Sequence, residues 1–145
     1  MTLFEDLTQL TSYQRKFFDK CKQEYPSENG IIHVTQTSAS SLLFTEHGHF
    51  KAPHHENKTL NYYQWCLVSP QQLQLSHLRY KEATLLATFA LNPTAMVFTS
   101  QPFQCAQDSY NARLHYGDGA IILSWQINGP KKDLFIETHY RHASL

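Results

Sequence analysis

Asp108 and Tyr110 are the side chains whose types and spacing best suit proton transfer. They lie two residues apart, so on an extended strand both would project from the same face. One interpretation is a buried carboxylate–phenol hydrogen bond that stabilises a wall of the fold. The other is a proton-transfer pair in a cavity, with Tyr110 as donor and Asp108 as base. Glu46 and Tyr140 would complete such a pocket if the strands between them close into a barrel.

A second group with chemical potential is the segment Gly129-Pro130-Lys131-Lys132-Asp133. Its glycine, proline and aspartate are typical of a tight turn between two strands. In the alternative interpretation, Lys132 and Asp133 lie at the mouth of a barrel, where the lysine could contact a ligand carboxylate or phosphate. The candidate catalytic residues are therefore Asp108, Tyr110 and Lys132.

The histidines and cysteines predict no metal site. His47 and His49, among 9 histidines, could ligate a metal from one strand face, but no thiolate or carboxylate has matching spacing. We expect this pair at a solvated hairpin tip. Cys21, Cys66 and Cys105 are odd in number and widely spaced, which favours free thiols in a reducing compartment. We expect Cys66 and Cys105 to be buried as small apolar side chains and to have no catalytic role, and no cofactor is predicted.

Charge and composition exclude several classes of function. The chain has 145 residues, with 12 Lys and Arg against 12 Asp and Glu, so its formal net charge is zero. This balance offers no bulk attraction to nucleic acid or to an anionic membrane, and it is compatible with a homodimer. The acidic N-terminus does not resemble a secretory signal, and no apolar stretch is long enough to span a bilayer. A cytoplasmic location is expected.

The first 28 residues are predicted to be helical, as part of a single domain over residues 1–145. Leu3, Leu7, Leu10, Phe17 and Cys21 are spaced three, four or seven apart, which is typical of one face of a helix. Turn-forming residues from position 26 to 30 would end this segment. Such a helix would cover an open end or a flank of the remaining domain, which is predicted as a β-barrel over residues 30–143.

After residue 30 the pattern changes to short β-type runs separated by turns. Strands are expected at 31–37, 41–51, 59–68, 73–79, 84–91, 95–103, 110–116, 120–128 and 133–142, and an exposed loop at 52–57. Gly117-Asp118-Gly119 is a strong hairpin signal, since these residues tolerate positive φ. About eight or nine strands without interleaved helices favour an antiparallel, lipocalin- or calycin-like barrel, which can hold one small ligand. A half-open sheet wrapped around a helix is the structural alternative.

The last third of the chain carries a family resemblance. Cys105-Ala106-Gln107-Asp108-Ser109-Tyr110 is followed by Trp125 through Asp133, with the pattern W-x-x-x-G-P-x-K-D, and then by Thr138-His139-Tyr140. This series resembles domain-of-unknown-function family 6314, over roughly residues 42–142. The resemblance implies a lipocalin-type barrel and no particular reaction. Phe103 stands where this family pattern usually has a histidine, and a second histidine has no match near residues 85–86. The N-terminal segment has no match to it either.

Three hypotheses of function follow. In the first, the barrel binds a small, partly apolar ligand. The second is an enzyme that uses acid–base groups in the same cavity, and the third is a solid barrel that binds a protein partner. The predicted ligand-binding residues are Glu46, Tyr63, Trp65, Asp108, Tyr110, Trp125, Lys132 and Tyr140, with Phe89 as a further apolar wall.

Overall fold

The computed structural model describes residues 2–80 and 82–143, a part of the chain that holds one short helix and eleven β-strands. These elements are α1 (Leu3–Leu7), β1 (Leu10–Asp19), β2 (Ser27–Ser38), β3 (Ser41–Ala52), β4 (His55–Ser69), β5 (Gln72–Arg79), β6 (Glu82–Ala90), β7 (Val97–Thr99), β8 (Phe103–Cys105), β9 (Asp108–Gly117), β10 (Ala120–Gly129) and β11 (Lys132–His142). The prediction of a mainly β, antiparallel fold is confirmed.

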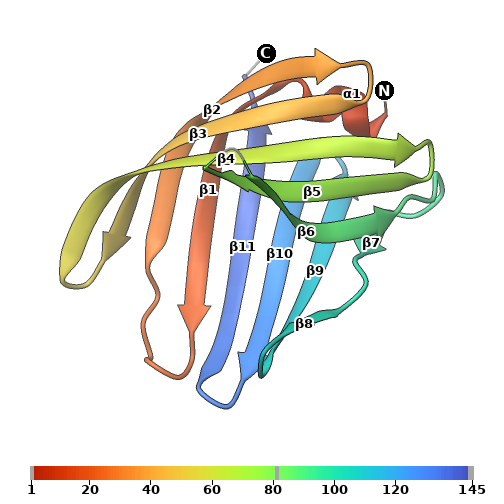
Figure 1. The fold of residues 1–145 in the computed structure, drawn as a ribbon. Helices are drawn as coiled ribbons and strands as arrows, with labels where there is room; N and C mark the ends of the chain where they lie inside the picture. Colours follow the sequence, from red (N-terminus) through yellow and green to blue (C-terminus); the bar gives the residue numbers. More distant parts are fainter. Residues whose placement is uncertain (1, 81, 144–145) are drawn as a thin grey trace.

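The strands form one curled antiparallel sheet in the order β6-β5-β4-β3-β2-β1-β11-β10-β9-β7, and β8 pairs with β9. Strand β1 pairs with both β2 and β11, so the first and last strands of the chain join its two halves. The two edges, β6 and β7, approach each other, and an isolated bridge links Phe89 to Ser100. The result is a half-barrel whose strands curl around a common interior (Figure 1).

The prediction of helix over residues 1–28 is wrong beyond Leu7. Thr2 and Glu5 form a capping box that starts α1, and the helix ends after five residues. Residues 10–19 form β1 instead, where Tyr13, Arg15 and Phe17 alternate toward the interior with a period of two. Pairing on both edges with β2 and β11 stabilises this strand over a helix, so tertiary context overrides the apolar spacing.

The later strands lie close to where the sequence places them. Eight of the nine predicted strands correspond to β2 through β6 and β9 through β11, while the predicted strand at 95–103 is divided into β7 and β8. Pro102 cannot donate a ladder hydrogen bond, which is consistent with the break. The predicted hairpin after Gly117 is confirmed, with φ values of 53° at Asp118 and 74° at Gly119. The predicted loop at 52–57 is shorter, since β3 extends to Ala52 and β4 starts at His55.

The hydrophobic core includes the short helix α1 as well as residues from most of the strands. Leu3, Phe4 and Leu7 of α1 are buried in it, so the short helix covers one end of the strands. The hydroxyl of Tyr116 donates a hydrogen bond to Asp6, which ties α1 to β9. Desolvation of the Tyr116 phenol and its hydrogen bond to the Asp6 carboxylate raise the pKa of Tyr116 to about 12, so this phenol stays protonated as a donor.

The three cysteines are free thiols, as expected. Cys105 is exposed, because β8 is a short strand at the periphery of the sheet, and Cys66 is half-buried. The predicted burial of Cys105 is therefore wrong. Within the described part of the chain, no helix has the length and apolar character needed to cross a membrane.

Two glycines face each other across β2 and β3 and leave room for a tyrosine. Gly30 is the register partner of Gly48, and the Tyr13 side chain occupies the space beside both. A Cβ atom on Gly48 would overlap the Tyr13 hydroxyl and would lie 2.6 Å from both Glu28 Oε2 and Thr59 Oγ1. The glycines thus allow polar groups to meet inside the barrel.

We expect Gly48→Ala to lower the free energy of unfolding by about 1–3 kcal/mol, the usual cost of overpacking a filled interior. Gly117→Ala is the matched control, since its added Cβ would meet mainly the end of the flexible Met96 side chain. Urea denaturation followed by circular dichroism measures both variants. Equal effects of the two substitutions would contradict the close packing around Gly48.

Candidate functional site

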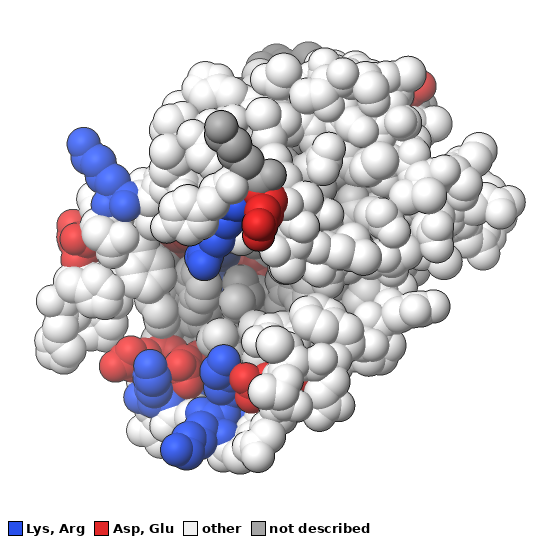
Figure 2. Space-filling view, in the orientation of Figure 1, with Lys and Arg blue, Asp and Glu red and all other residues white. Residues whose placement is uncertain are grey.

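The interior of the barrel contains a cavity of about 250 Å³. Its apolar lining consists of Phe17, Leu75, Leu86, Leu123, Trp125 and Ile136, and its polar lining of Arg15, Glu28, Asn61, Tyr63, Thr138 and Tyr140. In the same orientation as Figure 1, the molecular surface is hollowed, and acidic and basic side chains gather at the rim (Figure 2). A concave site with an apolar wall and a few polar groups is the usual form of a small-molecule site.

Arg15 organises the polar side of the cavity with all three of its guanidinium nitrogens. Its Nη2 lies 3.1 Å and 3.4 Å from the two carboxylate oxygens of Glu46, and its Nη1 lies 3.5 Å from Glu28 Oε2. Its Nε donates to Thr138 Oγ1 at 2.8 Å. The guanidinium carbon also lies 4.7 Å from the centre of the Tyr13 ring. The cation is therefore held from three strands and by one aromatic face.

Burial shapes the electrostatics of this cluster. Removal from water raises the pKa of Glu46, and the neighbouring Arg15 guanidinium offsets part of that increase. Burial would lower the pKa of Arg15, but Glu46, Tyr140, Tyr63 and Glu28 together raise it, so the guanidinium stays charged. An unpaired charge at this depth would be costly, and the two carboxylates provide the compensation.

Tyr63 and Tyr140 supply two protected phenols to the cavity. Burial is the main cause that raises the pKa of each, and the Glu46 carboxylate raises it further. Both phenols therefore keep their protons at neutral pH and can donate hydrogen bonds. The ring of Tyr63 stacks on His77 with 5.0 Å between centres, and burial lowers the pKa of that histidine.

Four of the predicted ligand-binding residues meet inside the barrel. Tyr63, Trp125 and Tyr140 line the cavity, and Glu46 lies behind Arg15. Trp65 does not line the cavity; it is fully buried in the core, where it stacks on Phe89. Its indole Nε1 has no hydrogen-bond partner among the described residues. Trp65 and Phe89 thus belong to the packed end of the barrel.

Asp108, Tyr110 and Lys132 do not line this cavity. Lys132 Nζ lies 3.1 Å from Asp108 Oδ2 on the surface, and Tyr110 stacks on Phe103 at 4.8 Å. The Asp108 carboxylate also rests against Gly129, where a Cβ atom would overlap it. The motif residues on β9 and in the β10–β11 turn therefore hold two neighbouring hairpins together. Asp108 contacts Lys132, whereas one interpretation of the sequence paired it with Tyr110. A ligand-binding or catalytic role for them stays a prediction.

Sequence reasoning missed Arg15, Glu28, Asn61 and Thr138 as site residues. Arg15 lies in the segment that was predicted to be helical, and Glu28 at the supposed end of that segment. The alternation of Tyr13, Arg15 and Phe17 was the signal that could have placed the arginine on an inner strand face. Its partner Glu46 was singled out, but from a predicted pocket around Asp108.

His47 and His49 are exposed and point outward from within β3, so the prediction that they lie at a hairpin tip is wrong. The His47 ring packs against His33, and His49 Nε2 lies 3.3 Å from Glu56. In the parts of the chain the structure describes, no group of three or more His, Cys, Asp or Glu side chains is arranged to hold a metal ion.

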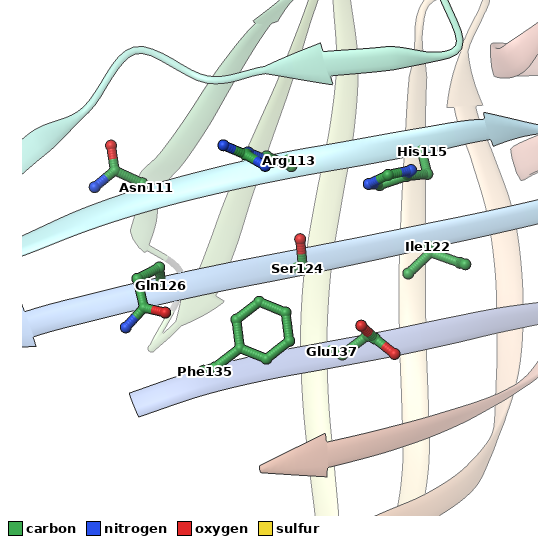
Figure 3. Close-up of a pocket in the computed structure, with 8 residues that line it drawn as sticks. All are labelled: Asn111, Arg113, His115, Ile122, Ser124, Gln126, Phe135 and Glu137. Atoms are coloured by element: carbon green, nitrogen blue, oxygen red, sulfur yellow. The ribbon is translucent and has the colours of Figure 1, made fainter. Parts of the chain in front are cut away.

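A second depression lies on the outer face of β9, β10 and β11 and has a volume of about 500 Å³. Its lining residues are Asn111, Arg113, His115, Ile122, Ser124, Gln126, Phe135 and Glu137 (Figure 3). These side chains alternate with the buried ones of the same strands and therefore face away from the interior. Its charged side chains, Arg113 and Glu137, are exposed and half-buried, whereas Arg15 and Glu28 of the interior cavity are buried.

Comparison with known proteins gives a family. The family of unknown function DUF6314 matches residues 10–142, so the chain belongs to that family. No curated protein matches the chain. One similar solved structure is a redesigned β-barrel, mFAP1, bound to DFHBI, with 10% sequence identity, a TM-score of 0.45 and coverage of 94% of this chain and 97% of that one. Another is EF1p2_mFAP2b bound to DFHBI, with 9% identity, a TM-score of 0.47 and coverage of 94% and 95%.

The raised pKa of Glu46 predicts a specific pH dependence. A carboxyl whose pKa is higher in the folded state binds its proton more tightly there, so its contribution to stability is largest below the unfolded value of 4.5. That contribution falls as pH rises through the folded pKa. We expect the stability difference between the native chain and Glu46→Gln to decrease as pH rises above 4.5.

Urea denaturation at several pH values measures this difference. Glu82→Gln, at an exposed position at the start of β6, is the control. If the difference in free energy of unfolding between the native chain and Glu46→Gln increased with pH, the pKa of Glu46 would be lowered by folding, and the prediction would be wrong.

Proposed function

We propose that this member of the DUF6314 family binds a small, partly apolar molecule in the cavity inside its barrel. The observation that carries the proposal is the coexistence of an apolar wall and buried, ordered polar groups around one space of about 250 Å³. A barrel whose interior served only for stability would gain from filling this space with side chains, since unfilled volume in a core costs free energy.

The two sides of the cavity suit different parts of one ligand. Phe17, Trp125 and Ile136 offer a surface on which a ring or an alkyl group would lose its contact with water. Tyr63 and Asn61 on β4 face the same space and offer hydrogen bonds that would fix the orientation of a ligand. Arg15, Glu28 and Thr138 are already held by neighbouring side chains, so these groups would need little ordering on binding.

The acid–base alternative has less support from this geometry. Its candidate residues Asp108 and Lys132 form an ion pair outside the cavity, 3.1 Å apart, with the lysine exposed and the aspartate half-buried. The carboxyl with a raised pKa is Glu46, which Arg15 holds with two contacts. Binding is therefore the function that we favour. A cytoplasmic location and a homodimer stay predictions.

The two tryptophans of the chain allow a test that locates the ligand. Trp125 lines the cavity, whereas Trp65 lies in the core. Protein labelled with 5-fluorotryptophan is titrated with 2-phenylethylamine, 2-phenylethanol and 3-phenylpropionate, which share a phenyl group and differ in charge. We expect at least one of them to shift the Trp125 fluorine resonance and to leave the Trp65 resonance nearly unchanged.

Two matched variants separate cavity binding from surface binding. Leu86→Trp adds a large ring to the cavity wall, whereas Leu85→Trp adds it at the neighbouring exposed position on β6. We expect Leu86→Trp to weaken binding about tenfold or more by occupying the space, and Leu85→Trp to leave it unchanged. Equal affinity of the two variants, or no response of Trp125 to any probe, would contradict the proposal.

A further inference from the structure

We infer that the barrel cavity is built for a small organic cation, an ammonium group on an apolar body, and excludes carboxylates. This inference rests on the proposed binding function and names the ligand class of the same cavity. It follows from the number of charges around the cavity, from the atoms that are already engaged, and from one carboxylate oxygen that has no partner.

The buried cluster beside the cavity has no surplus positive charge. The buried cluster contains one guanidinium, Arg15, and two carboxylates, Glu28 and Glu46. Whether or not one carboxylate holds a proton, such a cluster never has a net positive charge. A ligand carboxylate beside this cluster would therefore meet no uncompensated buried cation, because the other arginine that acts on Tyr63, Arg79, is exposed to solvent at the end of β5.

Arg15 is also engaged at each nitrogen. Its Nη2 contacts Glu46 and its Nη1 contacts Glu28, as described above, and its Nε donates to Thr138. An anionic ligand would have to displace one of these partners and leave a buried carboxylate without its cation. The guanidinium is therefore a structural counter-charge and is not available as an anion receptor.

Glu28 is the group that is open to a ligand. It is only 4% exposed and lines the cavity. Its Oε2 accepts hydrogen bonds from the hydroxyls of Tyr13 and Thr59, the latter at 3.0 Å, and faces Arg15. Its Oε1 has no hydrogen-bond partner among the described residues. This oxygen is not among the fully buried atoms that lack a partner, so it is open to the cavity, where a ligand can bring the donor that the described residues do not supply.

The surroundings suit an ammonium ion. Thr59, Asn61 and Tyr63 share the inner face of β4, and Asn61 and Tyr63 line the same cavity as Glu28, which Thr59 contacts. An ammonium group has three donors, and Glu28, Asn61 and Tyr63 each carry an acceptor oxygen. The rings of Tyr63 and Trp125 line the same space and attract cations through their faces.

The probes of the preceding section rank the ligand classes directly. The three compounds carry the same phenyl group with an amine, an alcohol or a carboxylate. We expect 2-phenylethylamine to bind at least about tenfold more tightly than 2-phenylethanol, and 3-phenylpropionate to bind most weakly. If the alcohol or the acid binds as tightly as the amine, the inference is overturned while the binding function stands. If no probe shifts Trp125, both fall.

Glu28→Gln tests the residue with little change in shape. We expect it to weaken amine binding about ten- to a hundredfold, the range that a hydrogen bond to a charged group contributes, and to change alcohol binding far less. Glu137→Gln is the matched control, because Glu137 lines the outer depression on β11. If Glu137→Gln weakened amine binding and Glu28→Gln did not, the cation would bind at the outer face, and the inference would be overturned. Should Glu28→Gln fail to fold, the ranking of the three probes on the native chain decides.

Discussion

The buried guanidinium of Arg15 is the constraint that the rest of the interior must satisfy. A charge at this depth persists only if opposite charges and hydrogen-bond acceptors surround it, and the barrel supplies these from three other strands. Glu28 comes from β2, Glu46 from β3 and Thr138 from β11. Because β1 carries Arg15 between β2 and β11, the cluster lies where the first and last strands of the chain meet.

The same cluster determines which small residues the neighbouring strands require. Tyr13 supports the guanidinium with its ring and donates its hydroxyl to Glu28, and that ring needs the space left by Gly30 and Gly48. Toward α1 the interior is filled with apolar side chains, and beyond the cluster it is not. The cavity thus begins at the Arg15 cluster. Aliphatic side chains could not fill the space beside it without leaving buried polar groups unsatisfied.

The later strands could be predicted from the sequence, because alternation of apolar and polar residues and clear turn signals mark them. The N-terminal region could not, since its leucine spacing fits a helix and only pairing with β2 and β11 makes it a strand. That error concealed Arg15, and with it the polar side of the cavity. Tyr63, Trp125 and Tyr140 were found from residue type and strand face, whereas Trp65 was placed in the site because sequence does not tell the packed end of a strand from its open end.

The motif that carries the family resemblance has a different role from the one expected. Asp108 contacts Lys132 and packs against Gly129, so these residues of the pattern fix the position of the β10–β11 turn against β9. A glycine is required there because a Cβ atom would overlap the carboxylate. One part of the pattern, around Asp108, Gly129 and Lys132, therefore joins two hairpins, whereas Trp125, Thr138 and Tyr140 of the same pattern line the cavity.

A double-mutant cycle on Arg15 and Glu46 tests the central claim, that the buried ion pair holds the interior together, most directly. The account predicts that Arg15→Met alone lowers the free energy of unfolding by about 3–5 kcal/mol, because it leaves buried carboxylates without their cation. The double variant Arg15→Met/Glu46→Gln should lose less free energy of unfolding than the two single variants together. The difference should be about 1 kcal/mol or more, which is the size of interaction energy found for contacting pairs. Losses that simply add would show that the two side chains act independently and would contradict the account.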